Sequence, residues 1–236
     1  MYFSRITPAP GQAHRAAQQR LDGPYAEHQW LWRCFPAPEG SPRDFLFRRQ
    51  LVQGLPCYYI VSVRPPALPD DAWQAQSRPY EPELAAGERL AFELRANPTV
   101  RAAAPPGVKG KRHDVVMHEK KRLLAERGLR TWAEWTTPDR PSLIELTQRA
   151  CGTWLAKRGE YLGFALEPES LDVDAPQQQN ERKRADVESQ LQFTSVDLRG
   201  HLRVTDPERF RAALFHGVGS AKSLGCGLLL VRRLAG

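Results

Sequence analysis

The sequence predicts an α+β protein that consists of two ferredoxin-like units in tandem, each an antiparallel sheet with helices on one face. The elements expected in residues 1–96 follow the order βαββ(α)β with a weak second helix, which fits a ferredoxin-like unit. Residues 97–236 repeat that order with additions, although the two halves share no visible sequence identity. The length of 236 residues also suits two domains of about 100 residues each.

The first half opens with a strand and a helical region. Tyr2–Ile6 alternates enough to form a strand, and the helical region extends from Ala13 to about Cys34 with an interruption at 22–24. We expect a new helix to start at Pro24, because proline suits the first position of a helix. Further strands are expected at 45–47, 57–63 and 88–96, the last of which alternates apolar and charged residues as half-buried strands do.

The second half follows Asn97-Pro98 and contains a Gly-rich basic turn at 107–111. We expect a helix over 114–127, strands over 154–166 and 190–198, a helix over 207–215 with Asp206 as its N-cap, and a final strand over 228–231. The segment 167–184 is polar and contains proline and several glutamines, so it predicts a mobile hairpin tip with a basic end at 182–184.

Positive charge is concentrated in one part of the chain. The formal net charge is +7, and the segment from Arg101 to Arg130 contains nine basic and three acidic residues. Such a concentration favours a face that binds a polyanion. Nucleic acid is therefore the class of partner that the composition suggests first.

The sequence disfavours several other classes of protein. The cysteines Cys34, Cys57, Cys151 and Cys226 lack zinc-site spacing, so we expect buried free thiols in a reducing cytoplasm. No apolar signal core and no run of about 18 apolar residues occurs, so we expect a cytoplasmic protein that does not enter a membrane. Asp70-Asp71 is the nearest carboxylate pair, but it lies in a proline-rich loop, and we expect neither a metal nor a small-molecule cofactor.

The most distinctive local pattern is a glycine-rich loop between the 207–215 helix and the final strand. It contains Gly217, Gly219, Gly225 and Gly227, with Lys222 among them. The backbone N–H groups of such a loop can hold phosphate oxygens. A Walker A loop is excluded because Ala221 precedes Lys222, and a dinucleotide loop should follow a strand and open a helix. A plain tight connection between helix and strand is the alternative.

Four features, in order along the chain, resemble the CasE (Cse3) family of CRISPR RNA-processing endoribonucleases. They are Pro24-Tyr25-Ala26-Glu27-His28 near a helix start, Leu94-Arg95-Ala96-Asn97-Pro98 at the end of the first half, the basic turn Gly110-Lys111-Arg112, and the glycine-rich loop before a closing apolar strand. Together they span essentially the whole chain. The segment 131–180 matches poorly, and nothing is transferred to it.

The resemblance implies a tandem ferredoxin-like (RRM-like) fold, binding of a CRISPR repeat stem-loop, a single cut at its 3′ base, and retention of the product with the other subunits of the Cascade complex. An RNA stem is read mainly through its shape and phosphates. The residues expected to bind RNA are Arg101, Lys109, Lys111, Arg112, His113, Arg182, Lys183, Arg184, Gly217, Gly219, Lys222, Gly225 and Gly227. For each basic residue, a solvated surface charge is the alternative.

The implied chemistry is metal-independent cleavage by the neighbouring 2′-OH, which leaves a 2′,3′-cyclic phosphate and a 5′-OH. It needs a base, an acid and a group that stabilises the charged phosphorane, but no metal-activated water. His28 is the expected catalytic histidine, because a helix N-terminus favours a nearby phosphate and lowers the pKa of an adjacent histidine. Tyr25 shares its helical face and is expected to orient the imidazole or hold the 2′ oxygen.

Alternatives to this assignment stay open. Tyr25 and His28 could simply pack beside Trp32, His216 could serve in place of His28, and the sequence does not say which group is base and which is acid. Two rival functions are a non-catalytic RNA-hairpin-binding module and a structural subunit of a ribonucleoprotein. The aromatic motif of RRM domains is absent, which disfavours ordinary readout of single-stranded RNA.

Overall fold

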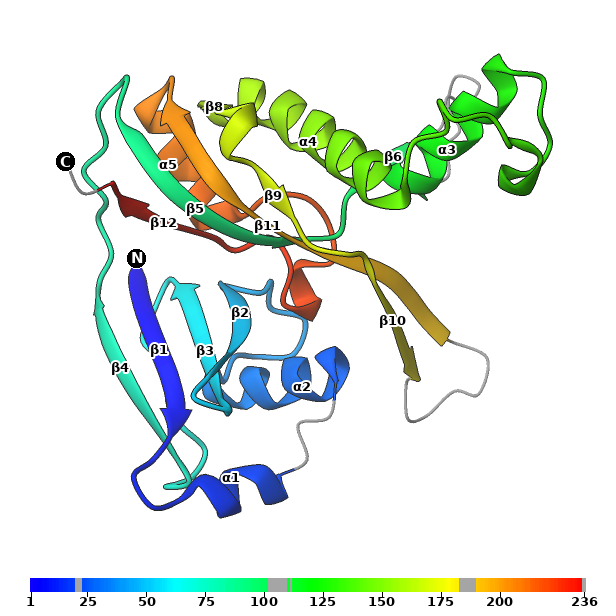
Figure 1. Cartoon of the computed structure of the whole chain (residues 1–236). Coiled ribbons are helices and arrows are strands. Elements are labelled where there is room, and N and C mark those ends of the chain that lie inside the picture. Colours follow the sequence, from blue (N-terminus) through cyan, green and yellow to red (C-terminus); the bar gives the residue numbers. More distant parts are fainter. Residues whose placement is uncertain (20–22, 102–109, 111, 183–189, 235–236) are drawn as a thin grey trace.

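The computed structural model describes residues 1–19, 23–101, 110, 112–182 and 190–234 (Figure 1). Two antiparallel sheets, each with helices packed against it, make up most of the molecule, so the predicted α+β class is confirmed. A small two-stranded ribbon, β6 (Thr99–Arg101) and β7 (Arg112–Asp114), lies beside the second sheet. Among the described helices, none is long and apolar enough to cross a membrane.

The first sheet has the strand order β2-β3-β1-β4. Its strands are β1 (Tyr2–Pro8), β2 (Phe45–Val52), β3 (Leu55–Ser62) and β4 (Trp73–Pro79), and its helices are α1 (Ala13–Gln18) and α2 (Pro24–Cys34). As expected, α2 begins at Pro24. Its buried residues Trp30 and Leu31 pack with Phe47 and Ile60 in one apolar cluster, so the sheet fixes the orientation of α2.

The strand expected at 88–96 is confirmed, but its assignment to the first unit is wrong. This strand, β5 (Arg89–Ala96), pairs with β11 (Gln190–Val204) and β12 (Leu229–Arg233) in the second sheet. The edge of the first sheet is formed by β4 instead, which the sequence did not reveal because only Trp73 of that strand is buried. The weak second helix is absent from the fully described segment 63–72, where Pro65, Pro66 and Pro69 disfavour helix.

The second sheet has the order β10-β11-β5-β12, and the short strands β8 (Phe164–Leu166) and β9 (Asp172–Val173) also pair with β11. The remaining strand is β10 (Gln177–Arg182), and the helices are α3 (Val115–Glu126), α4 (Leu143–Leu162) and α5 (Pro207–His216). Trp154 of α4 and Phe210 of α5 share one core with Phe92 and Leu198 of the sheet. Counted along the chain within each sheet, with β10 as the second principal strand, both sheets have the order 2-3-1-4.

Two expectations for the second half are wrong. Residues 154–162 belong to helix α4, and only Phe164–Leu166 is a strand. The helix begins with a capping box between Ser142 and Glu145 and ends where Gly163 adopts a left-handed conformation. The segment expected to be a mobile tip contains β10, which is antiparallel to β11 from Gln177 to Arg182, whereas 183–189 lie outside the described residues.

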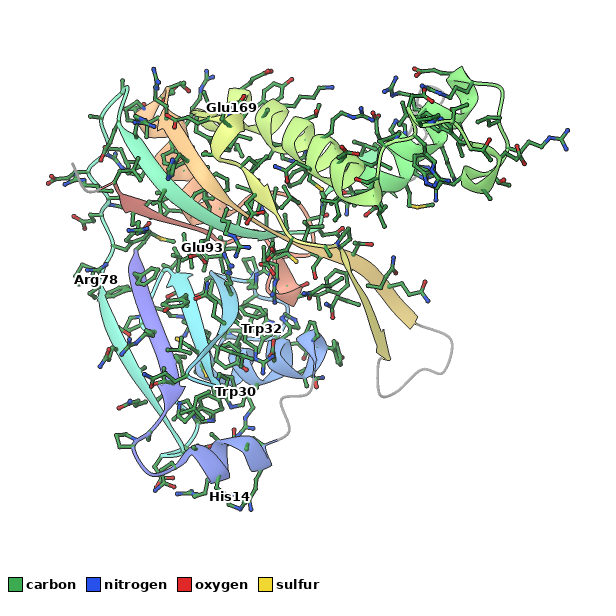
Figure 2. All side chains as sticks on the ribbon, in the orientation of Figure 1. His14, Trp30, Trp32, Arg78, Glu93 and Glu169 are labelled. Atoms are coloured by element: carbon green, nitrogen blue, oxygen red, sulfur yellow. The ribbon has the colours of Figure 1, made fainter. Side chains whose placement is uncertain are left out.

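Charged and apolar contacts join the two sheets. Arg48 of β2 has 8% of its side chain exposed and lies 3.3 Å from Asp197 of β11 and 3.4 Å from Glu93 of β5, which is labelled between the two sheets in Figure 2. Asp197 also accepts a 2.7 Å hydrogen bond from Arg95. Leu46 and Val61 of the first sheet cluster with Leu228 beside the second. These contacts hold α2 next to the glycine-rich loop.

Candidate functional site

A cavity of about 770 Å³ lies where α2 faces the glycine-rich loop. It is lined by Tyr25, His28, Asn97, Thr99, Arg112, Asp114, Gln178, Gln192, Phe193, Thr194, Ser220, Ala221, Ser223 and Leu224. Both units of the chain therefore contribute walls, and the two residues expected to be catalytic share this cavity.

The glycine-rich loop is folded tightly on itself and against the first sheet. Val218 N–H donates to the Gly227 carbonyl at 2.8 Å, and Gly227 N–H donates to the Arg95 carbonyl at 2.7 Å. Gly217 has a φ of +74°, and a Cβ there would lie 2.8 Å from both Leu46 Cδ1 and the Gly227 carbonyl oxygen. Glycine is required at this position because no side chain fits between the loop and β2.

This packing divides the loop into two parts. The N–H groups of Gly217 and Gly227 are used within the protein, the first by the Ala213 carbonyl and the second as described above. The middle of the loop, from Gly219 to Ser223, instead lines open space, and Gly225 has a positive φ beside Phe47. Contact of the glycines with RNA stays a prediction. The packing favours this contact for the middle of the loop, where Gly219 lines open space.

Lys222 belongs to a short 3-10 helix, η3 (Lys222–Leu224), within the loop. Its Nζ donates to the carbonyl of His216, the last residue of α5, and it therefore caps that helix. Burial, followed by the nearby charge of Arg43, lowers the pKa of Lys222. His216 itself does not line the cavity that contains Tyr25 and His28.

His28 is half-buried and is held by its neighbour Trp32. The indole Nε1–H of Trp32 donates to His28 Nε2 at 3.1 Å. Because an indole nitrogen can only donate, Nε2 must accept, and the neutral imidazole carries its proton on Nδ1. That Nδ1 is buried and has no hydrogen-bond partner among the described residues. Tyr25, on the same wall, accepts a 3.2 Å hydrogen bond from Gln29.

The pKa of His28 is lowered, as the sequence suggested, but the causes differ. Burial is the main one, and the positive charge of Arg43 is the second. The expected cause was the N-terminus of α2. A neutral imidazole at neutral pH can accept a proton, as a general base must.

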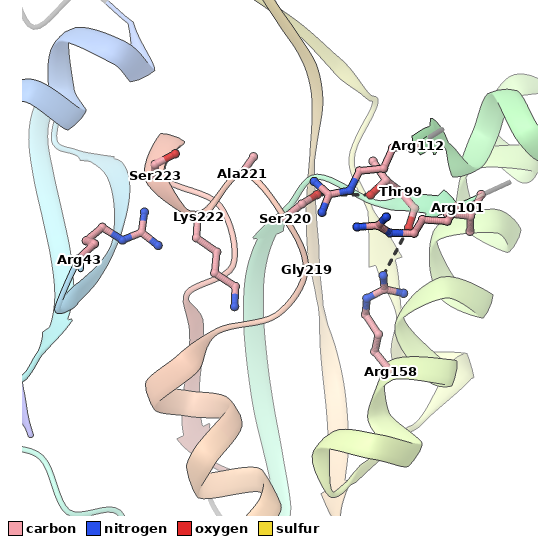
Figure 3. A pocket seen from close by; sticks show the side chains of 11 residues that line it. Arg43, Thr99, Arg101, Arg112, Arg158, Gly219, Ser220, Ala221, Lys222 and Ser223 are labelled. Atoms are coloured by element: carbon pink, nitrogen blue, oxygen red, sulfur yellow. Dashed lines mark hydrogen bonds between the residues drawn. The ribbon is translucent and has the colours of Figure 1, made fainter. Parts of the chain in front are cut away.

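A second cavity, of about 830 Å³, adjoins the first and shares Thr99, Arg112, Ser220, Ala221 and Ser223 with it. Its lining also contains Arg43, Arg101, Arg158 and Lys222, and none of the described residues that line it is acidic (Figure 3). Together the two cavities form one groove, which we call the basic groove. Asp114 is the acidic residue among the described residues that line the groove, and their excess of positive charge attracts a phosphate backbone.

The expected RNA-binding residues outside the glycine-rich loop fall into three groups. Arg101 and Arg112 line the basic groove from the β6–β7 ribbon. His113 pairs with Val100 in that ribbon but lines neither cavity. Lys109, Lys111, Lys183 and Arg184 lie outside the described residues, and of Arg182 only the backbone position at the end of β10 is described.

Sequence reasoning missed two residues of the groove, Arg43 and Arg158. It named Trp32 beside His28 only in the alternative in which Tyr25 and His28 are packed residues. Arg158 is on α4, in a region expected to be a strand, and its guanidinium stacks 4.1 Å from the Trp154 ring centroid. Arg43 follows Ser41-Pro42 in a segment without periodicity, so no local signal could have marked it. Trp32 is four residues after His28 on the same helix, a spacing that brings side chains together.

The chain matches a family model described as "CRISPR associated protein" over residues 1–233. It is 32% identical to the CRISPR-associated endoribonuclease Cse3 of Thermus thermophilus, over 98% of this chain and 99% of that protein. It is 28% identical to the CRISPR system Cascade subunit CasE of Escherichia coli K12, over 97% of this chain and 98% of that protein.

Solved structures show the same likeness. T. thermophilus Cse3 bound to an RNA representing a pre-cleavage complex aligns with a TM-score of 0.66 at 30% identity, covering 98% of each chain. E. coli Cas6e aligns with a TM-score of 0.53 at 22% identity, over 99% of this chain and 100% of that one, which supports the shared fold. The chain therefore belongs to the CRISPR-associated protein family and, within it, to the CasE/Cse3 group.

Proposed function

We propose that this protein is an endoribonuclease that binds the repeat stem-loop of CRISPR precursor RNA and cuts it. The observation that carries the proposal is that a neutral, half-buried His28 lies beside a groove whose second cavity is lined by several cations and, among the described residues, by no acid. The relationship to Cse3, named an endoribonuclease and solved with RNA, supports the same activity. Each of the two 2-3-1-4 sheets with its helices is proposed to be a ferredoxin-like unit.

In the proposed mechanism, the 2′-OH of the nucleotide 5′ of the cut attacks the adjacent phosphate. His28 takes the 2′-OH proton as the bond from the 2′ oxygen to phosphorus forms and the bond from phosphorus to the 5′ oxygen breaks. The products are a 2′,3′-cyclic phosphate and a 5′-OH, whose proton comes from solvent water. Tyr25, on the same cavity wall, orients the 2′ oxygen or the imidazole. The 2′-OH displaces the Trp32 indole from Nε2, since one lone pair cannot accept both.

We propose that this reaction is independent of metal ions, because an internal nucleophile needs no metal-activated water. Asp114, an acidic residue in the lining of the first cavity, has one carboxylate oxygen bonded to the N–H groups of Val116 and Met117 as the N-cap of α3. We further propose that the cut RNA stays bound and joins the protein to other subunits of a Cascade complex, by analogy with E. coli CasE.

The alternative is a protein that binds the hairpin without cutting it. The hydrogen bond from Trp32 favours this alternative, because it occupies the imidazole nitrogen that a base would use. The same contact is what a merely packed histidine would show.

Labelled repeat RNA distinguishes the two functions. In excess EDTA, we expect one cut in the all-ribose hairpin and none in a hairpin with a single 2′-deoxy sugar 5′ of the cut. Binding without cleavage would establish the alternative. Cleavage that EDTA abolishes and Mg²⁺ restores would overturn the metal-independent mechanism.

A further inference from the structure

Arg43 is a half-buried guanidinium for which no described residue provides a hydrogen bond or an ion pair. Its Nε is buried without a partner, and burial lowers its pKa. Among the described residues, its guanidinium lies near the ring of Phe45, whose centroid is 6.0 Å from the guanidinium carbon. The adjacent Asp44 pairs through Oδ2 with Arg64 at 2.8 Å, and burial is the only cause of the lowered pKa of Arg43, so the Asp44 charge does not offset that of Arg43. A desolvated cation without an anion is costly, so Arg43 is suited to receive an anionic ligand.

The position of Arg43 is next to both parts of the site. Its side chain lines the basic groove with Lys222 and Ser223, and Ser223 also lines the cavity that contains His28. Its charge lowers the pKa of His28 as well as that of Lys222. Figure 3 shows its guanidinium directed toward the loop that carries Lys222 and Ser223.

Two other cations of the groove are already engaged. The ammonium of Lys222 is bound to the His216 carbonyl. Arg158 stacks on Trp154 and donates to the carbonyls of Trp154 and Thr99 at 3.5 and 3.4 Å. Arg101 and Arg112 are exposed residues of the β6–β7 ribbon, and Arg112 also lines the cavity that contains His28. Arg43 thus combines desolvation, a free guanidinium and proximity to His28.

We propose that Arg43 binds the non-bridging oxygens of the phosphate at the cut and stabilises the additional negative charge of the phosphorane. This inference rests on the proposed endoribonuclease function and identifies its electrostatic catalyst. A guanidinium presents two parallel N–H donors that match two phosphate oxygens, and such bonds are stronger in a partly desolvated site. The transition state bears more charge on these oxygens than the bound RNA, so the contact favours the reaction over binding.

A binding experiment tests the contact without requiring cleavage. The probe is the repeat hairpin with a 2′-deoxy sugar 5′ of the cut, made either with a normal phosphate or with a neutral methylphosphonate at the cut. For the wild type and Arg33→Gln, we expect the methylphosphonate to weaken binding about tenfold or more. Arg33 is an exposed arginine of α2 that lines neither cavity, so Arg33→Gln removes the same charge as Arg43→Gln but outside the groove. For Arg43→Gln, we expect the methylphosphonate hairpin to bind almost as tightly as the hairpin with a normal phosphate. If the methylphosphonate weakens the binding of Arg43→Gln as much as that of the wild type, the proposal is overturned.

A kinetic experiment tests the catalytic role on the all-ribose hairpin at saturating protein. Arg43→Gln should cut about 10²–10³-fold more slowly than wild type, as loss of one oxyanion donor does in other enzymes. Arg43→Lys should recover part of the rate, and Arg33→Gln should cut at the wild-type rate. A rate for Arg43→Gln within threefold of wild type would overturn the proposal. If wild type binds but never cuts, the endoribonuclease function fails, while the methylphosphonate comparison still decides whether Arg43 contacts that phosphate.

Discussion

Two arginines five positions apart, Arg43 and Arg48, have opposite electrostatic environments. Arg48 lies at the junction of the two sheets, where Glu93 and Asp197 balance its charge. Arg43 lines the basic groove, and no described residue in the lining of its cavity is acidic. At the junction, opposite charges are matched within the protein and stabilise the fold. In the groove, positive charge is left for a ligand, which is the arrangement expected of a phosphate-binding surface. The predictions below test this division of roles.

The largest effect is expected from His28→Ala, which should lower the single-turnover rate while hairpin affinity changes little. Proton transfer by a positioned side chain contributes about 10²–10⁴ in rate, or roughly 3–5 kcal/mol of barrier. Affinity should come from phosphate contacts spread over the stem, to which one imidazole adds little. Cleavage and gel-shift titration on the same hairpin measure both. A rate within threefold of wild type would show that His28 is only a packed residue and would make His216 the next candidate.

At the junction, Asp197→Ala should lower stability without touching the groove. It removes the carboxylate that pairs with both Arg48 and Arg95 and leaves Arg48, already with two unpartnered nitrogens, without its nearest anion. Breaking a buried pair in this way costs about 3 kcal/mol. The matched control is Asp172→Ala, since Asp172 and its partner Arg199 are 60% and 58% exposed and such a pair contributes less than about 1 kcal/mol.

Urea unfolding of the two variants provides the measurement for this comparison. Asp197→Ala should unfold at a clearly lower denaturant concentration than Asp172→Ala, and at a temperature well below unfolding it should still bind the hairpin. Equal midpoints for the two variants would contradict the role assigned to the junction.

Whether a feature depends on adjacent or on distant residues explains which features the sequence revealed. Helix starts depend on a few adjacent residues, so Pro24 marked α2 and Asp206 marked α5, where it accepts hydrogen bonds from two backbone N–H groups. The family motifs likewise brought Tyr25 and His28 forward as one pair. Local signals of this kind need no knowledge of the rest of the fold.

Features that depend on distant partners could not be predicted from the sequence. The choice of sheet for β5 is made by β11, about 100 residues away, and neither strand encodes it alone. The apolar residues of α4 around Trp154 suit a strand or a helix, and the deciding cap lies at Ser142. Arg43 resembles any other arginine in the sequence, because its significance is that no described acidic side chain pairs with it in the folded structure.

Within the groove, Arg112→Ala should weaken hairpin binding and reduce its dependence on salt. Arg112 is exposed and lines both cavities, and no described residue forms an ion pair with it. If it contacts one phosphate, the slope of log K against log salt should fall by about 0.7–0.9 in magnitude. The saturated cleavage rate should stay near that of wild type. Titrations at several salt concentrations, with Arg33→Ala as the control, provide the test, and an unchanged slope would place Arg112 away from the RNA.

The smallest expected effect concerns pH and the contact between Trp32 and His28. Burial and Arg43 lower the pKa of His28 below the ordinary histidine value of about 6.5, so the neutral base persists as pH falls through that value. The rate should therefore decline only at lower pH, where the imidazole becomes protonated. Arg112 and Asp114 are charged residues that also line the cavity that contains His28. The Trp32→Phe substitution described next changes neither of them.

The Trp32→Phe variant distinguishes the pKa of His28 in the free protein from its pKa in the RNA complex. The indole N–H bonds only to the neutral ring, so its removal should raise the pKa of His28 and move the acid limb of kcat/KM, which reports the free protein, to higher pH. The acid limb of kcat, which reports the complex, should not move, because the 2′-OH has already displaced the indole there. A shift in both profiles would mean that Trp32 stays on Nε2 during catalysis and that the proton is accepted elsewhere. Arg33→Gln, a charge change outside both cavities, should leave both profiles where they are in the wild type.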